Sequence, residues 1–268
     1  MEFIELNDGH LIPKIGCGTS RYGKVDADFF AALNGDTSQM ESALAVGFRM
    51  FDTAIIYRNE DLIPKAMKNQ GFKRTDIYIE SKIDGEETYI KTDQTVRESI
   101  ESSLKKLDTD YIDLYLIHRP TGSDEENLRV WRVLESYHEK DILKSIGVSN
   151  FNVSELRYLL EHAKIKPSVN QIKSNPSNWH TDIIAFCKDH GVLPQIYSPL
   201  RSVDEDLRKK LSDIGKPWHK TWAQVLLRYH LDLGCQVIPM SYDRTHQAQN
   251  LDILDFKLSA ADMNSIRT

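Results

Sequence analysis

The sequence predicts a (β/α)8 barrel, also called a TIM barrel, preceded by an N-terminal β-hairpin. Eight short apolar, β-prone runs recur along the 268 residues, and segments with helical spacing of apolar residues lie between them. The runs are nearly continuously apolar, which is typical of parallel strands that are covered on both faces. Eight parallel strands joined by crossover helices close most simply into a barrel, with an open doubly wound sheet as the alternative.

The elements are expected in the following order. The hairpin pairs residues 3–6 with residues 10–12 across the turn Asn-Asp-Gly. The predicted strands are residues 14–19, 49–54, 76–82, 111–118, 144–150, 168–172, 194–199 and 236–241. Helical spacing is clearest in three groups of apolar residues: Val96, Ile100, Leu104 and Leu107; Leu156, Leu159 and Leu160; Trp222, Val225 and Leu226. No Pro/Gly-rich linker or internal repeat divides the chain, so we expect one domain, residues 1–268.

Composition excludes several classes of function. The 34 basic and 40 acidic residues are interspersed and sum to a net charge of -6, so no basic face suggests a nucleic-acid partner. No segment has the length and apolarity of a signal peptide or of a membrane span, so no membrane partner is expected. The three cysteines lie far apart in the sequence and are expected to be reduced. We expect a cytoplasmic monomer.

Each predicted strand ends in polar residues. The carboxyl ends of barrel strands meet at one mouth, so these side chains are expected to converge there. Taken alone, Asp52 is as readily a helix N-cap as a functional residue. A single histidine such as His118 is more often a core residue than a functional one. Their shared position at strand ends favours an active site instead. The residues are Thr19, Asp52, Lys82, His118, Ser149, Asn150, Gln171, Tyr197, Ser198 and Ser241.

Asp52, Lys82 and His118 of this set form a plausible acid catalyst together with Tyr57, which follows Asp52 by five residues. A tyrosine hydroxyl titrates near 10, roughly three units too high for an efficient proton donor at neutral pH. The ammonium group of Lys82 is expected to stabilise the phenolate of Tyr57 and to lower this pKa. A buried lysine needs a counter-charge, which Asp52 supplies, and His118 can orient an acceptor oxygen.

Other catalytic classes lack their motifs. The chain has no "GxSxG", no "HExxH" and no phosphate loop that ends in Gly-Lys-Ser or Gly-Lys-Thr. Gly16 and Gly18 are followed by Arg21 where a dinucleotide-binding fingerprint needs a third glycine. A metal-dependent barrel hydrolase needs closely spaced histidine pairs, whereas the nine histidines are scattered. We therefore predict no metal site.

The motifs "FDTAIIYRNE", "IESK", "LYLIHRP", "IGVSNF", "VNQI", "YSPL" and "VIP" follow one another along the chain. In this order they resemble the aldo-keto reductase family, whose members are (β/α)8 barrels that reduce carbonyl compounds with a nicotinamide cofactor. The resemblance implies that Tyr57 is the general acid, that Lys82 and Asp52 tune it, and that His118 holds the carbonyl oxygen of a small aldehyde or ketone.

The resemblance also implies a set of residues that bind the cofactor. Ser149, Asn150 and Gln171 are assigned to the nicotinamide carboxamide, and Tyr197 to stacking on its ring. Ser241 is assigned to phosphate and Asn250 to adenine, and the set is completed by Thr19, Ser198, Leu200 and Gln249. NADPH is the expected cofactor.

Several positions depart from the family pattern. Met240 and His246 stand where relatives that prefer NADPH carry a lysine and an arginine, so we expect a weakened preference and acceptance of NADH. Ser20 and Arg119 replace tryptophans that wall the substrate site, and no C-terminal loop follows the last predicted helix. An open pocket and a broad range of small aldehydes are therefore expected.

A different class of function remains as an alternative. It is a barrel that binds a cofactor but has a structural or regulatory role with little turnover. The complete set of Asp52, Tyr57, Lys82 and His118 argues against it, because a structural role requires none of them together.

Overall fold

The computed structural model describes residues 2–25, 29 and 31–267, and within these ranges eight parallel strands form one sheet in sequence order. A parallel bridge between Ile15 and Val237, with the Gly16 N–H donating to the Val237 carbonyl oxygen at 2.9 Å, joins the first strand to the last. The predicted barrel is confirmed, and the open doubly wound alternative is wrong. The strands are β3 (Cys17–Gly18), β4 (Met50–Asp52), β5 (Tyr78–Ile83), β6 (Ile112–Ile117), β7 (Leu143–Ser149), β8 (Val169–Lys173), β9 (Leu193–Tyr197) and β10 (Gln236–Val237).

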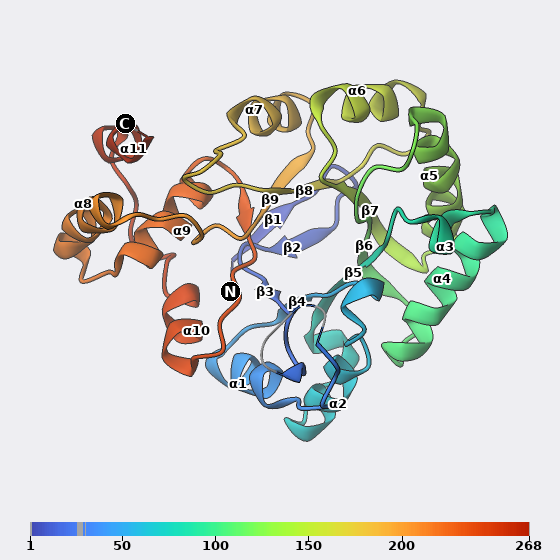
Figure 1. The fold of residues 1–268 in the computed structure, drawn as a ribbon, viewed down its shortest axis with the longest axis horizontal. Coiled ribbons are helices and arrows are strands. Elements are labelled where there is room, and N and C mark those ends of the chain that lie inside the picture. The colour runs from blue at the N-terminus through green and yellow to red at the C-terminus, as the bar shows by residue number, and fades with distance from the viewer. Residues whose placement is uncertain (1, 26–28, 30, 268) are drawn as a thin grey trace.

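Helices surround the strands (Figure 1). The predicted apolar faces are buried under them, as at Val96 and Ile100 on α4 and at Leu156 on α6. The helices are α1 (Ser38–Val46), α2 (Leu62–Asn69), α3 (Glu87–Ile90), α4 (Asp93–Lys106), α5 (Asp124–His138), α6 (Val153–His162), α7 (Thr181–Asp189), α8 (Glu205–Gly215), α9 (Trp222–Asp232), α10 (Arg244–Leu251) and α11 (Ala260–Arg267), with short 3-10 turns η2 (Ile55–Tyr57), η3 (Arg74–Asp76) and η4 (Lys216–Trp218). The single domain over residues 1–268 stays a prediction, and its two end residues lie outside the described ranges.

The predicted hairpin is confirmed and closes the N-terminal end of the barrel. Strands β1 (Phe3–Glu5) and β2 (Leu11–Pro13) are antiparallel, with Ile4 opposite Ile12. Ile12 is fully buried in a cluster with inward-facing side chains such as Leu114 and Val169. Polar side chains lie at the opposite end of the barrel, where the carboxyl ends of the strands meet.

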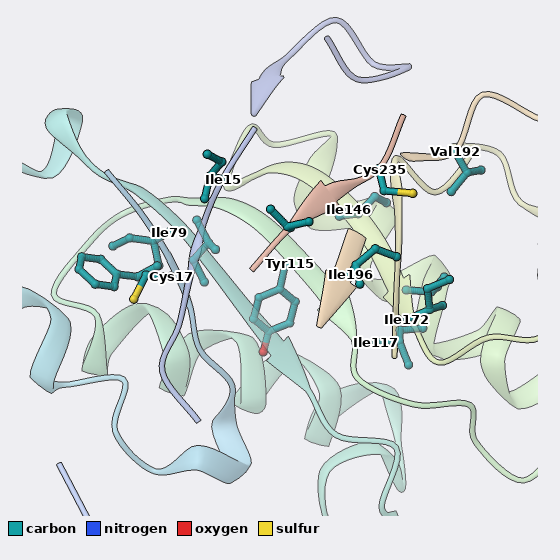
Figure 2. Close-up of a cluster of buried hydrophobic side chains, with 14 of the residues drawn as sticks. Ile15, Cys17, Ile79, Tyr115, Ile117, Ile146, Ile172, Val192, Ile196 and Cys235 are labelled. Carbon is teal, nitrogen blue, oxygen red and sulfur yellow. The ribbon is translucent and has the colours of Figure 1, made fainter. Parts of the chain in front are cut away.

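The main core lies between the strands and the helices. Figure 2 shows the outward-facing side chains of this layer, among them Ile79 of β5, Tyr115 and Ile117 of β6, and Ile196 of β9. Because side chains alternate along a strand, the residues between these ones face the barrel interior. Asp52, Glu80 and Lys82 therefore point inward, toward one another.

The glycines of the first strand allow the barrel to close. A Cβ on Gly16 would lie 2.9 Å from Cγ2 of Ile238, and one on Gly18 would lie 3.2 Å from the Ile238 carbonyl oxygen. The first contact is closer than real Cβ atoms approach, and the second would require the Ile238 carbonyl group to shift by a few tenths of an ångström. The motif "GCG" thus serves the packing of β3 against the segment after β10, which agrees with the rejection of a dinucleotide-binding fingerprint.

The cysteines are free and buried, as expected. Burial raises the pKa of the Cys17 thiol to about 12 and that of the Cys187 thiol to about 11. These thiols stay protonated at neutral pH. Across the described ranges, none of the helices has the length and apolarity needed to cross a membrane.

His230 on α9 is a buried polar residue outside the mouth. Its side chain is fully buried, and among the described residues neither ring nitrogen has a hydrogen-bond partner. Trp179 and Tyr229 pack against the ring, with centroids 6.0 and 5.4 Å away. Burial lowers the pKa of His230 from 6.5 to about 3, because a charged imidazole would lose its hydration.

We expect this residue to make the protein less stable in mild acid. The unfolded chain protonates His230 below about pH 6.5, whereas the folded chain does so only below about pH 3, so stability falls as the pH drops through this window. At pH 5 the loss is about 2 kcal/mol. Urea unfolding of the wild type and of His230→Leu at pH 7 and pH 5 checks this, because the variant should lose less stability than the wild type. Equal losses would contradict it.

Candidate active site

A cavity of about 370 Å³ opens at the carboxyl ends of the strands. Asp52, Tyr57 and His118 line it, and Lys82 lies beneath them with no exposed surface. The predicted convergence of these four residues is therefore observed in the fold. The other lining residues are Gly18, Ser20, Phe29, Ile56, Asn150, Gln171, Tyr197, Ser198, Pro199, Leu200, Arg201, Ile238, Pro239 and Met240.

Lys82 and Asp52 form a buried ion pair at the floor of the cavity. The Lys82 Nζ contacts Asp52 Oδ1 and donates to the Thr53 carbonyl oxygen at 2.8 Å. Burial by itself would lower the pKa of Lys82, but the nearby Asp52, Tyr57 and Glu80 raise it above its ordinary value. Lys82 is therefore charged. Asp52 is its counter-ion rather than a helix cap, since the N-cap of the following turn η2 is Ala54.

Tyr57 ends the turn η2, and Arg58 after it adopts a left-handed conformation with φ of 62°. The Lys82 Nζ lies 5.3 Å from the centroid of the Tyr57 ring. Burial raises the pKa of Tyr57, Lys82 opposes this effect, and Asp52 adds to it, so the net pKa lies above the usual value. The expected lowering of this pKa is wrong, because burial of the ring outweighs the single ammonium charge. Tyr57 therefore holds its proton firmly at neutral pH.

His118 follows β6 and packs edge-on against Tyr57, with ring centroids 5.5 Å apart. Burial lowers the pKa of His118 well below its ordinary value, and the charges of Lys82 and Arg119 lower it further. The ring is therefore neutral at neutral pH and offers one N–H group.

Arg119, at the position of a family tryptophan, is held by acidic neighbours. Its Nη2 lies 2.6 Å from Asp84 Oδ1 and 2.6 Å from Glu86 Oε1. Its charge is largely balanced by these carboxylates, and the guanidinium is not among the groups that line the cavity.

Several predicted cofactor residues are brought together on one wall. Asn150 is left-handed, with φ of 62°, and its Nδ2 donates to the His118 carbonyl oxygen at 2.9 Å. Its Oδ1 accepts from the Tyr197 hydroxyl at 2.9 Å, so Asn150 ties two strand ends together. Gln171 lies below them, and Ser198 and Leu200 continue the wall.

Thr19 and Ser149 lie behind this wall instead of lining the cavity. Both side chains are fully buried. The Thr19 Oγ1 donates to the Asp52 carbonyl oxygen at 2.8 Å, and the Ser149 Oγ donates to the Gln171 carbonyl oxygen at 3.0 Å. The structure thus places these hydroxyls where they brace neighbouring strands, and their contact with a cofactor stays a prediction.

Gln249 and Asn250 lie on α10 and Ser241 precedes this helix, and all three are outside the set of residues that line the cavity. Asp243 caps this helix, because its Oδ1 accepts from the His246 N–H at 2.9 Å. Met240 precedes them and lines the cavity, with its Sδ 3.8 Å from the Ser20 Oγ. Position 240 carries no positive charge. Arg201 is therefore the only Lys or Arg among the described residues that line the cavity.

Three interior residues were not singled out from the sequence: Glu80, Gln195 and Gln236. All three are fully buried. Glu80 precedes Lys82 by two residues on one strand, and side chains alternate along a strand. The sequence alone could therefore have placed Glu80 on the same inner face as Lys82. In the part of the chain that the structure describes, no group of three or more His, Cys, Asp or Glu side chains is arranged to hold a metal ion.

Comparison with known proteins adds the following. The profile described as "Aldo/keto reductase family" matches residues 14–268. A methylglyoxal reductase of Yersinia pestis is 32% identical over 268 residues, which cover 98% of this chain and 91% of that protein. A glyoxal reductase of Bacillus subtilis is 35% identical over 265 residues, with the same coverage of 98% and 91%.

Solved structures are similar over almost the whole chain. The crystal structure of an aldo/keto reductase from Brucella melitensis superposes with a TM-score of 0.89 at 33% identity, covering 99% of this chain and 98% of that one. That of a Bombyx mori aldo-keto reductase in complex with NADP has a TM-score of 0.87 at 30% identity, covering 99% and 92%.

Proposed function

Because this chain belongs to the aldo/keto reductase family, we propose that Tyr57 is the general acid with which this NADPH-dependent oxidoreductase reduces small aldehydes and ketones to alcohols. The observation that carries this proposal is the buried Lys82–Asp52 ion pair directly beneath Tyr57 and His118 at one cavity. The cytoplasmic location and the monomeric state stay predictions.

The cavity suits a nicotinamide cofactor. The Tyr197 ring supplies an aromatic wall, and the Gln171 side-chain oxygen, which accepts no hydrogen bond from the described residues, supplies an acceptor. Asn150 and Gln171 would hold the carboxamide, and Leu200 would lie over the dinucleotide. The bound cofactor supplies the hydride.

The side chains of this protein supply the proton that the carbonyl oxygen of the substrate receives. The neutral His118 donates its N–H group to the carbonyl oxygen and aligns it with the Tyr57 hydroxyl. Tyr57 gives its proton to that oxygen as negative charge develops on it. The Lys82 ammonium stabilises the phenolate that remains, and Asp52 keeps Lys82 charged inside the barrel.

Small, uncharged carbonyl compounds fit the site best. Similarity to a methylglyoxal reductase and a glyoxal reductase supports this class of substrate. Ser20 widens one wall, and Arg119, which Asp84 and Glu86 pair outside the cavity lining, offers no unpaired charge to an anionic substrate. Discrimination among small aldehydes should therefore be weak.

A panel of aldehydes, ketones and keto acids, assayed by the loss of NADPH absorbance, tests this function. Turnover of several small aldehydes and dicarbonyl compounds is expected, with keto acids slower. A protein that binds NADPH but turns over none of the panel would favour the structural or regulatory alternative.

Cofactor choice gives a separate prediction. Met240 offers no charge to an adenosine 2′-phosphate, and the exposed carboxylate of Asp243 occupies the N-terminus of α10, where an anion would otherwise be favoured. A lost charge-assisted contact weakens binding by about one to two powers of ten, so the preference for NADPH over NADH should be small.

Met240→Lys should then tighten NADPH binding by about one to two powers of ten and leave NADH nearly unchanged. Dissociation constants for both cofactors measure this, with Met240→Leu as the control of similar size. Equal gains for the two cofactors would mean that position 240 does not face the 2′-phosphate.

A further inference from the structure

A row of amide side chains runs through the interior of the barrel. Gln236 of β10 is the register partner of Gln195 of β9, which in turn is the partner of Gln171 of β8. All three are buried, and Glu80 of β5 is fully buried beside them. Barrel interiors are usually filled by branched apolar residues, so a buried polar row needs a role that apolar packing cannot fill.

The row has a fixed direction. It starts at the carbonyl oxygen of Pro13, which can only accept, so Gln236 must offer its Nε2 there, at 2.6 Å. This turns the Gln236 oxygen toward Gln195, whose Nε2 donates to it at 2.6 Å. The oxygen of Gln195 then accepts from the Nε2 of Gln171. The orientation of one amide thus determines that of the next.

Glu80 enforces the same direction from the other side. Its Oε1 accepts from the Gln171 Nε2 at 2.6 Å, and its Oε2 accepts from the Gln195 Nε2 at 2.6 Å. Burial and the charge of Asp52 raise the pKa of Glu80 well above its usual value. Each carboxyl oxygen accepts from one amide, so Glu80 fixes the orientation of both.

The consequence appears at the floor of the cavity. With its NH2 group turned inward to Glu80, Gln195 and Asp52, Gln171 leaves its side-chain oxygen for the cavity. Gln171 itself is a lining residue. The ligand group that complements this oxygen is an N–H donor.

We propose that Glu80, Gln195 and Gln236 are positioning residues that lock the Gln171 amide with its oxygen toward the cavity, so that the site selects a cofactor whose ring carries an N–H donor. This inference rests on the proposed function, in which Gln171 meets the nicotinamide carboxamide. An acetyl group in place of the carboxamide keeps the carbonyl oxygen but offers no N–H group.

Binding of the oxidised cofactor tests this without turnover. Dissociation constants for NADP+ and for its 3-acetylpyridine analogue are measured by quenching of the tryptophan fluorescence. The wild type should bind the acetyl analogue about ten- to a hundredfold more weakly, because the Gln171 oxygen then stays unpaired. In Glu80→Gln the new amide can donate to Gln171, which lets that side chain turn around. The ratio of the two constants should fall by about tenfold.

Two further variants complete the experiment. Glu60 is also fully buried and bonds Ser81, outside the row, so Glu60→Gln is the matched control and should keep the wild-type ratio. Glu80→Leu combined with Gln195→Leu removes two of the three inward acceptors and leaves only Asp52, so it should also lower the ratio. A purely structural role for the row would change both constants alike and leave the ratio intact.

A wild-type ratio near one, or a ratio that Glu80→Gln leaves unchanged, would overturn the inference. If the double variant does not fold, Glu80→Gln, in which a carboxyl is replaced by an amide of the same shape, decides the question alone. Binding of NADP+ with no carbonyl reduction would refute the proposed function, whereas active enzyme with an unchanged ratio would refute only the role of the row.

Discussion

Replacing Tyr57 by phenylalanine should lower kcat for carbonyl reduction by about a thousandfold or more, because general acid catalysis supplies about 10²- to 10⁴-fold and the neutral His118 can hydrogen-bond to the carbonyl oxygen but is too weak an acid to replace Tyr57. Tyr57 holds its proton at neutral pH, since burial raises its pKa, so the wild-type enzyme is always in the proton-donating form. The variant keeps the ring that packs against His118 and Phe29, with centroids 5.5 and 5.7 Å away.

The dissociation constant for NADPH should therefore change by less than about threefold, which is under 1 kcal/mol. Steady-state kinetics and fluorescence titration measure the two effects. Tyr115→Phe is the control, because Tyr115 lies on the outer face of β6 and its hydroxyl meets Ser103 at 3.3 Å, away from the cavity. A Tyr57→Phe enzyme with near wild-type kcat would remove Tyr57 from the mechanism.

The second large effect is expected when Lys82 loses both of its carboxyl neighbours. In Asp52→Asn alone, Glu80 remains, with its Oε1 3.6 Å from the Lys82 Nζ. Glu80 can then serve as the counter-ion of Lys82, so the loss of stability should be moderate. In Asp52→Asn combined with Glu80→Gln the ammonium stands alone, and breaking a buried pair in this way costs about 3–5 kcal/mol.

The double variant should also be nearly inactive at neutral pH, because an unpaired buried lysine becomes neutral and no longer stabilises the phenolate of Tyr57. Urea unfolding and kcat, measured for both single variants and for the double variant, test this as a double-mutant cycle. The double loss of stability should exceed the sum of the single losses. Additive losses would show that Glu80 is not a second counter-ion.

Much of the architecture was predictable because it depends on local patterns. The nearly continuous apolar, β-prone character of short runs such as residues 111–118 identified the strands, and the recurrence of eight such runs predicted the barrel, which the closure at Ile15 and Val237 confirms. The end of each run was also local information. Asp52, Lys82 and His118 could therefore be assigned to one mouth before their distances were known.

Only the tertiary structure decided how those side chains act. Thr19 and Ser149 end their strands as predicted, yet they brace the backbone behind the cavity, because the direction of a side chain at a strand end depends on how the following loop turns. The pKa of Tyr57 lies above its usual value because segments distant in sequence bury the ring, and no pattern near residue 57 reports that burial.

The interior row shows the same division most clearly. Alternation of side chains along each strand places four polar residues on an inner face, and this can be read from the sequence alone. They are Glu80, Gln171, Gln195 and Gln236. Their hydrogen bonds, however, join residues that are up to 223 positions apart in the sequence, as between Gln236 and Pro13. Local periodicity determines which face of a strand a residue occupies, whereas the closure of the barrel determines which residues meet across it. A single sequence carries the first kind of information at every position and the second only through the packing of the whole chain.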